Sequence, residues 1–319
     1  MHFSSFFKLV EIRTKLASQI PLLLGTVYAY SRFHRLEAVN FLLLFLSLLS
    51  FDMVTTALNN YFDYKRAKRK HGYNYEVHNV IVRDRLSEFV VVSVILMLLC
   101  FAVLTGLLLV RRTDILVLLI GMLSFLIGIC YSFGPIPVSR TPFGELLSGF
   151  FMGFVIIFLS VYIHLKGQNL VVLSYSAGNL TITLGLVRLL EIFLLSVPVL
   201  CGISNIMLAN NICDMEEDYE NRRYTLPVYI GREWALLVFR ALYYLAFADI
   251  VLLVFFNIVP VYCLGTLLLI IPVERNIRLF LAVQTKKDTF SLSVRNFLLI
   301  GSALTGLMAV GALMRIFLP

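Results

Sequence analysis

The chain has 319 residues, of which 60% are hydrophobic and only 14% are charged, and its mean hydropathy is +0.89. This apolar content is far above that of soluble domains and indicates an integral membrane protein. The formal net charge of +8 would suggest a nucleic-acid partner for a soluble protein. Here membrane topology explains most of the charge, so we expect no nucleic-acid binding.

Nine apolar segments are long enough, or nearly so, to cross a bilayer, which takes about 20 residues. They lie near residues 16–31, 39–60, 87–110, 113–131, 143–165, 188–212, 233–256, 258–274 and 296–317. These segments predict an all-α bundle of nine transmembrane helices that forms one domain over residues 1–319 and is surrounded by membrane lipid. Asp52 lies inside the second segment, where we expect a polar contact between helices. Gly149 and Gly153 in the fifth are typical of close helix packing.

Lysine and arginine are divided unequally between the two sides of this predicted bundle. The N-terminus and the loops after the second, fourth, sixth and eighth segments hold 19 of them, whereas the other side holds 7. The positive-inside rule therefore predicts a multi-pass protein of the cell membrane with its N-terminus in the cytoplasm.

One pattern, Asn-Asn-x-x-Asp, closes both the second and the sixth segment, at residues 59–63 and 210–214. On a continuous helix, Asn210, Asp214 and Asp218 would lie one turn apart on a single face. Clustered carboxylate and amide oxygens are the ligands that Mg²⁺ prefers, commonly shared with substrate phosphates. Both copies fall on the predicted cytoplasmic face, so the sequence predicts a metal-dependent active site there.

The plainer interpretation is that these residues begin polar loops, because Asn and Asp are good loop formers. Two observations favour the metal site. The pattern occurs twice on one predicted face, and a carboxylate at the C-terminal end of a helix is disfavoured by the helix dipole unless a cation offsets it.

Three loops on that face carry side chains that suit phosphate oxygens. The loop after the second segment begins with Lys65 in a run of basic residues, most of which we assign to topology and to attraction for anionic lipids. The loop after the sixth segment holds Arg222 and Arg223, whose guanidinium forks can bind oxyanions through two hydrogen bonds. The loop after the fourth segment is rich in glycine and proline and offers Tyr131 and Arg140 as donors.

Taken together, these segments resemble the UbiA superfamily of intramembrane aromatic prenyltransferases, and most of all its 1,4-dihydroxy-2-naphthoate branch. The resemblance lies in residues 59–66, in residues 131–145 with their Gly-Pro-x-Pro core, and in residues 210–231 with Thr225-Leu226-Pro227. The first stretch departs from the family, which has Asp at the position of Asn60. The further acid that usually follows is also absent, since this region reads Ala67-Lys68-Arg69. The first motif therefore binds its cation more weakly, or the loop cations meet the diphosphate directly.

The resemblance implies a UbiA-like fold and a Mg²⁺-dependent transferase that moves a polyprenyl group from polyprenyl diphosphate to an aromatic acceptor. For 1,4-dihydroxy-2-naphthoate, loss of carbon dioxide would give demethylmenaquinone. The implied catalytic residues are Asp63, Asp214 and Asp218. The implied metal ligands are Asn59, Asn60, Asp63, Asn210, Asp214 and Asp218. The implied diphosphate-binding residues are Lys65, Tyr131, Arg140, Arg222 and Arg223.

Two alternatives remain open from the sequence. The acceptor could be another aromatic or quinone precursor, such as 4-hydroxybenzoate. The acidic residues could instead line the cation path of a cation-coupled transporter, although such paths place ionisable groups near the middle of the bilayer. The clusters here lie at one edge of the membrane, which favours an enzyme.

Overall fold

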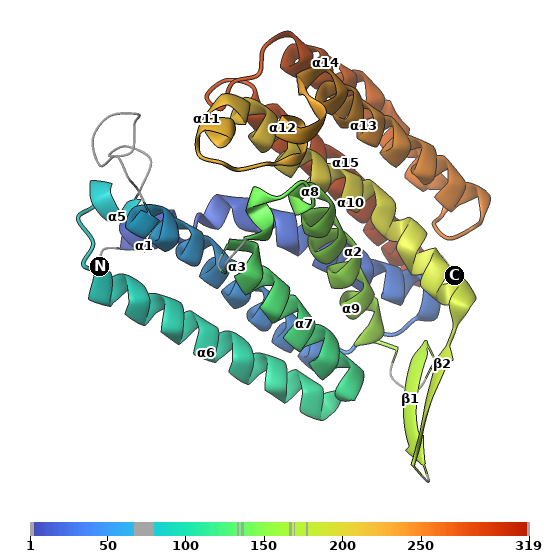
Figure 1. Ribbon diagram of the computed structural model, residues 1–319. Helices are drawn as coiled ribbons and strands as arrows, with labels where there is room; N and C mark the ends of the chain where they lie inside the picture. Colours follow the sequence, from blue (N-terminus) through green and yellow to red (C-terminus); the bar gives the residue numbers. More distant parts are fainter. Residues whose placement is uncertain are drawn as a thin grey trace. The chain divides into compact units, whose positions relative to one another are not determined.

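The structure is a computed structural model that describes residues 3–66, 80–132, 134, 137–165, 168, 170–176 and 178–317. The described chain is helical apart from one β-hairpin (Figure 1). It divides into two compact units. Unit 1 comprises residues 1–19 and 42–137, and unit 2 comprises residues 20–41 and 138–319.

The described elements of unit 1 are all helices. They are α1 (Phe3–Leu9), η1 (Ile12–Lys15), the first residues of α2 (Leu16–Phe33), most of α3 (Ala38–Arg66), α5 (Val80–Arg83), α6 (Glu88–Arg112) and α7 (Ile115–Ser132). Ser87 caps α6, because its side chain accepts a hydrogen bond from the Val90 amide. A buried apolar cluster joins α1, α3, α5 and α6, and its members include Leu9, Val54, Ile81 and Val91.

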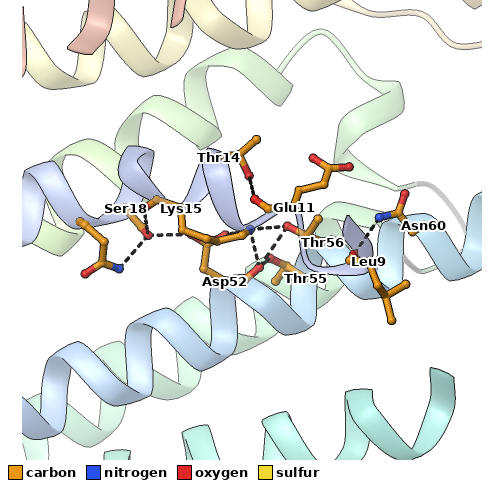
Figure 2. Close-up of polar contacts among 10 residues, drawn as sticks. Leu9, Glu11, Thr14, Lys15, Ser18, Asp52, Thr55, Thr56 and Asn60 are labelled. Carbon is orange, nitrogen blue, oxygen red and sulfur yellow. Dashed lines mark hydrogen bonds and ion pairs between the residues drawn. The ribbon is translucent and has the colours of Figure 1, made fainter. Parts of the chain in front are cut away.

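A buried ion pair ties the N-terminal segment of unit 1 to α3. The Lys15 ammonium donates to Asp52 Oδ1 at 2.7 Å and to Thr56 Oγ1 at 2.5 Å, and the Ser18 hydroxyl donates to Asp52 Oδ2 at 2.6 Å. Figure 2 shows these side chains converging between η1, the start of α2 and α3. The polar interhelical contact predicted for Asp52 is confirmed, and Lys15 is its partner.

Unit 2 begins with the remainder of α2 and ends with α15 (Phe290–Phe317). Between them lie η2 (Val138–Arg140), α8 (Gly144–Ser148), the π-helical turn η3 (Gly149–Val155), α9 (Ile156–Tyr162), β1 (Val171–Ser176), β2 (Asn179–Leu184), α10 (Leu186–Cys213), α11 (Met215–Glu220), α12 (Leu226–Ile230), α13 (Arg232–Phe255), η4 (Val261–Leu269) and α14 (Ile270–Ala282).

Helix α10 is the centre of unit 2 and packs against α13, α15 and η3. The close approach of η3 depends on small residues, because a Cβ atom at Gly153 would lie 2.7 Å from the α-carbon of Leu200. The close packing predicted for Gly149 and Gly153 is therefore confirmed. On its other side α10 joins a core with α13 and α14, in which the Phe239 and Phe280 rings lie 4.5 Å apart.

Among the described residues, six helical segments are long and apolar enough to cross a membrane: Ala38–Phe62, Glu88–Arg112, Gly144–Tyr162, Leu186–Cys213, Arg232–Phe255 and Phe290–Met314. A shorter apolar helix covers Ile115–Tyr131. The chain is thus a multi-pass helical membrane protein, while the count of nine spans stays a prediction. The eighth predicted segment, 258–274, differs most. It is the 3-10 helix η4 followed by α14, which continues to Ala282 and carries the charged residues Glu274, Arg275 and Arg278.

The Lys15–Asp52 pair provides a test of the fold. Lys15→Met should destabilise the protein by about 3–5 kcal/mol, because it leaves a largely buried carboxylate without its counter-charge. The double variant Lys15→Met/Asp52→Leu should recover most of this loss, since it leaves no unpaired charge. Thermal unfolding in detergent measures both effects. Lys8→Met is the matched control, because Lys8 is half-exposed and its 3.7 Å pair with Asp84 should contribute about 0–1 kcal/mol. Equal loss in the single and double variants would contradict this account.

Candidate active site

The second Asn-Asn-x-x-Asp motif lies where α10 passes into α11 in unit 2. Asn210, Asp214 and Asp218 do not lie on one continuous helix, because α10 ends at Cys213, close to the predicted end of the sixth segment at residue 212, and Asp214 joins α10 to α11 with φ −100° and ψ 7°. The Asp214 amide still donates to the Asn210 carbonyl at 3.2 Å, and the Asp218 amide donates to the Asp214 carbonyl at 2.8 Å. The break has a physical reason. Glu216, Glu217 and Asp218 occupy the first turn of α11, and acidic residues favour a helix N-terminus.

Asp218 is a buried carboxylate with two partners in the same loop. Its Oδ1 lies 3.2 Å from Arg223 Nε, and its Oδ2 accepts from the Thr225 hydroxyl at 3.3 Å. The Arg223 amide also donates to the Asp218 carbonyl at 2.8 Å. Burial raises the pKa of Asp218 above its ordinary value, Arg223 lowers it, and the neighbouring Asp214 raises it. Asp214 and Asp218 are thus close enough to interact electrostatically.

Asp214 is paired with a cation from a distant part of the chain. Lys286, in the loop between α14 and α15, forms an ion pair with Asp214 Oδ2. The Lys286 side chain is more than half exposed, so it can leave the carboxylate without unfolding its surroundings. Sequence analysis missed Lys286 because its charge served only to assign topology. The sequence did contain one indication of this role, which is the adjacent pair Lys286-Lys287 on the predicted cytoplasmic side.

Glu145 is a second residue that the sequence analysis did not assign to the site. It is buried at the start of α8, where Oε1 accepts from Asn211 Nδ2 at 2.8 Å. Its other oxygen, Oε2, is buried and has no hydrogen-bond partner in the described part of the chain. Asn210 Nδ2 donates to Asn211 Oδ1 at 3.4 Å, so the paired asparagines connect the motif to α8. Asn211 therefore holds the Glu145 carboxylate in place, and it does not simply begin a polar loop.

A backbone hydrogen bond connects the segment of Arg140 to the loop that follows Asp218. The Tyr224 amide donates to the Arg140 carbonyl at 3.1 Å, which places η2 beside the loop that carries Arg222 and Arg223. Arg222 is exposed and has a left-handed backbone conformation, with φ 55°. That conformation is uncommon for a residue with a side chain and marks a sharp turn in the loop. Arg140, Arg222 and Arg223 thus belong to one neighbourhood.

The first Asn-Asn-x-x-Asp motif lies in unit 1, at the end of α3. Asn59 is exposed, and Asn60 Nδ2 donates to the Leu9 carbonyl at 2.9 Å, a contact that Figure 2 also shows. Asp63 belongs to the last turns of the helix. Lys65 pairs with Glu88 at 2.6 Å and lies 5.8 Å from the Tyr61 ring centroid. The rest of the predicted basic loop, including Lys68 and Arg69, lies outside the described residues.

Tyr131, near the end of α7, also belongs to unit 1. The predicted site residues are therefore divided between the units. Asn59, Asn60, Asp63, Lys65 and Tyr131 belong to unit 1, and Arg140, Asn210, Asp214, Asp218, Arg222 and Arg223 belong to unit 2. A single metal site shared by both motifs stays a prediction.

The donor chemistry of the second motif fits a hard cation. Carboxylate oxygens of Asp214 and Asp218 are the ligands that Mg²⁺ prefers. Each is balanced here by a positive side chain, Lys286 or Arg223, as expected for a site whose acids need a counter-charge. Within the described part of the chain, no three His, Cys, Asp or Glu side chains come together closely enough to hold a metal. Ligands beyond the two aspartates would therefore have to include amide oxygens, substrate oxygens or water.

Comparison with known proteins agrees with this arrangement. The model of the UbiA prenyltransferase family matches residues 18–313. The chain is 29% identical to 1,4-dihydroxy-2-naphthoate octaprenyltransferase of Bacillus subtilis over 248 aligned residues. The aligned region covers 78% of this chain and 73% of that protein.

Solved structures show the same fold. A UbiA homologue from Aeropyrum pernix K1 has a TM-score of 0.64 at 17% identity, with 90% of this chain and 96% of that chain covered. A UbiA homologue from Archaeoglobus fulgidus bound to DMAPP and Mg²⁺ has a TM-score of 0.61 at 12% identity, with 96% and 99% covered. Because the family model spans nearly the whole chain, this protein belongs to the UbiA prenyltransferase family and is a membrane-embedded prenyltransferase similar to the 1,4-dihydroxy-2-naphthoate enzymes.

Proposed function

We propose that this prenyltransferase moves a polyprenyl group from polyprenyl diphosphate to 1,4-dihydroxy-2-naphthoate in a Mg²⁺-dependent reaction. The observation that carries the proposal is the pair of aspartates at the junction of α10 and α11, each balanced by a partly exposed cation. The acceptor is proposed from the name of the Bacillus subtilis relative, and the use of a prenyl diphosphate with Mg²⁺ from the Archaeoglobus fulgidus structure.

The residues that would hold the metal are Asn59, Asn60 and Asp63 in the first motif and Asn210, Asp214 and Asp218 in the second. When bound, Mg²⁺ would supply positive charge to the diphosphate as it leaves. The first motif brings one carboxylate, so neighbouring cations such as Lys65 have a larger share in neutralising the diphosphate than in relatives with more acids there.

Lys286 and Arg223 have a second role in this proposal. In this structure they neutralise Asp214 and Asp218. If these carboxylates held Mg²⁺, Lys286 and Arg223 would be free to bind the diphosphate oxygens, to which a charged donor forms strong hydrogen bonds. Arg140 and Arg222 flank the same loop, and Tyr131 is a further donor from α7. Lys286 and Arg223 would remain at the site, where their charge and that of Mg²⁺ together would offset the negative charge of the diphosphate.

The reaction balances without an oxidant. The allylic C–O bond of the donor breaks, and its electron pair leaves with the diphosphate. The ring carbon that bears the carboxylate forms the new C–C bond, and the carboxylate leaves from the same carbon as carbon dioxide, whose former C–C electrons return to the ring. The product is demethylmenaquinone in its hydroquinone form. The excess of Lys and Arg on the site's predicted side supports a cytoplasmic active site.

The first test replaces the acids without changing their shape. Asp214→Asn and Asp218→Asn should each lower kcat by at least about a hundred-fold, since each removes a carboxylate proposed to hold the Mg²⁺ that would stabilise the leaving diphosphate. Release of pyrophosphate and carbon dioxide from a polyprenyl diphosphate and 1,4-dihydroxy-2-naphthoate measures the loss. Glu217→Gln, which changes an exposed acid in the same turn, is the matched control. If either aspartate variant kept near-normal turnover, the assignment of the second motif would be wrong.

The second test concerns Lys286. Lys286→Met should tighten Mg²⁺ or Mn²⁺ binding in the absence of donor, by up to about five-fold, because a half-exposed competing ion pair of about 0–1 kcal/mol is removed. It should also raise the KM for the donor by about one to two decades, since a charged contact to phosphate contributes about 1.5–3 kcal/mol. Electron paramagnetic resonance of bound Mn²⁺ and steady-state kinetics measure the two effects.

Lys287→Met is the control for Lys286, because the neighbouring lysine is exposed and has the same charge and length. It should leave both metal binding and the donor KM unchanged. The exchange role would be refuted if the two lysine variants behaved alike.

The third test separates donor from acceptor. Arg140→Ala and Arg223→Ala should weaken use of the prenyl diphosphate by about one to two decades, for the same phosphate contact of about 1.5–3 kcal/mol, and change the acceptor KM little. Arg140→Lys should keep part of the effect, because an ammonium supplies charge without the planar fork. Arg278→Ala, at an exposed position on α14, is the control. A change confined to the acceptor KM would place the diphosphate elsewhere.

A further inference from the structure

The segment between α9 and α10 is a β-hairpin in an otherwise helical protein. Strands β1 and β2 pair antiparallel from Val171 opposite Leu184 to Ser176 opposite Asn179. Figure 1 shows the hairpin extending away from the helices of unit 2 near the start of α10. At its base, the Gly185 amide donates to the Leu170 carbonyl at 2.9 Å and the Tyr162 hydroxyl donates to the Val171 carbonyl at 3.3 Å.

The register divides the hairpin into two chemically different faces. Residues alternate between faces along a strand, and directly paired residues share a face. One face is wholly apolar and carries Val171, Leu173, Tyr175, Leu180, Ile182 and Leu184. The other face carries Ser174, Asn179, Thr181 and Thr183, with Val172 as its apolar exception. The chain has no charged residue from 170 to 187.

The apolar face is not covered by the described protein. Tyr175 is 76% exposed, Leu180 65%, Ile182 55% and Leu184 48%. The exposed apolar surface continues directly into α10, where Leu186 and Val187 are also exposed. Since α10 is long and apolar enough to span the membrane, its exposed apolar side faces lipid. The hairpin's apolar face is thus continuous with a lipid-facing surface.

The backbone decides how deep such a hairpin can lie. A two-stranded ribbon has two outer edges with unpaired N–H and C=O groups, and these cannot be satisfied inside the hydrocarbon core. A fully aqueous position would leave the four exposed side chains of this face, Tyr175, Leu180, Ile182 and Leu184, in water. Only the boundary between headgroups and acyl chains satisfies both requirements, because it offers water to the edges and the polar face and acyl chains to the apolar face.

We propose that the β1–β2 hairpin lies in the membrane interface, with its apolar face on the phospholipid acyl chains and its hydroxyl-bearing face toward headgroups and water. Tyr175 then sits at the depth where amphipathic aromatic side chains concentrate. The hairpin acts as a lipid-binding surface in addition to the catalytic site, and its assignment does not depend on the proposed acceptor.

The test uses tryptophan fluorescence of the full-length protein in phosphatidylcholine–phosphatidylglycerol vesicles. The only tryptophan, Trp234, is first replaced by Phe. Ile182→Trp then places a probe on the apolar face, and Thr181→Trp places the same probe one residue away on the polar face. A second pair, Leu180→Trp and Asn179→Trp, repeats the comparison if either first variant unfolds earlier than the parent.

The expected result is a blue-shifted emission for the probe at 182 and its quenching by phosphatidylcholine brominated in the upper acyl chain, at a depth of roughly 5–10 Å as for other interfacial segments. The probe at 181 should emit at longer wavelength and be quenched by aqueous iodide instead. Equal iodide quenching at both positions would overturn the proposal in favour of a hairpin in water. A blue shift at 182 without quenching by brominated lipid would also overturn it, because the face would then be covered by protein such as a second copy of the chain.

Discussion

The absence of water from the bilayer core is the constraint on which the rest of this structure depends. A backbone N–H or C=O without a hydrogen bond there costs several kcal/mol, so the spanning parts of the chain are helices that bond within themselves. The same constraint applies to charge. Lys15 and Asp52 are tolerated in the helical part of unit 1 because they bind each other, and Ser18 and Thr56 complete the set of hydrogen bonds.

The same cost of unpaired charge applies to the acidic residues that follow α10, but their ion pairs are not permanent. Asp214 and Asp218 lie beyond the span and are paired with side chains that are themselves partly exposed, Lys286 and Arg223, so these partners are able to leave. The partner of Asp52, Lys15, is itself buried, so this pair could not exchange its counter-ion for a substrate. The difference in exposure between Lys15 and Lys286 separates a structural ion pair from one suited to binding.

Two glycines in the π-helical turn η3 allow close packing against α10, and this packing positions Glu145 near the second motif. Gly149 and Gly153 allow η3 to approach α10, and this approach places Glu145 beside Asn211. The Ser204 hydroxyl donates to the Glu145 carbonyl at 3.1 Å and strengthens the same junction. A larger side chain at Gly149 or Gly153 would therefore alter the site without replacing a proposed metal ligand, because α8, which carries Glu145, would have to move.

The sequence by itself determined the membrane class, most of the helix positions and the two matched motifs, because hydropathy and local spacing report on burial and on neighbours along the chain. It also indicated that Asp52 needed a polar partner. It could not identify Lys15 as that partner or pair Lys286 with Asp214. Those features depend on which distant segments pack together. Only the tertiary structure decides such long-range contacts, since their energies come from side chains that are far apart in the chain.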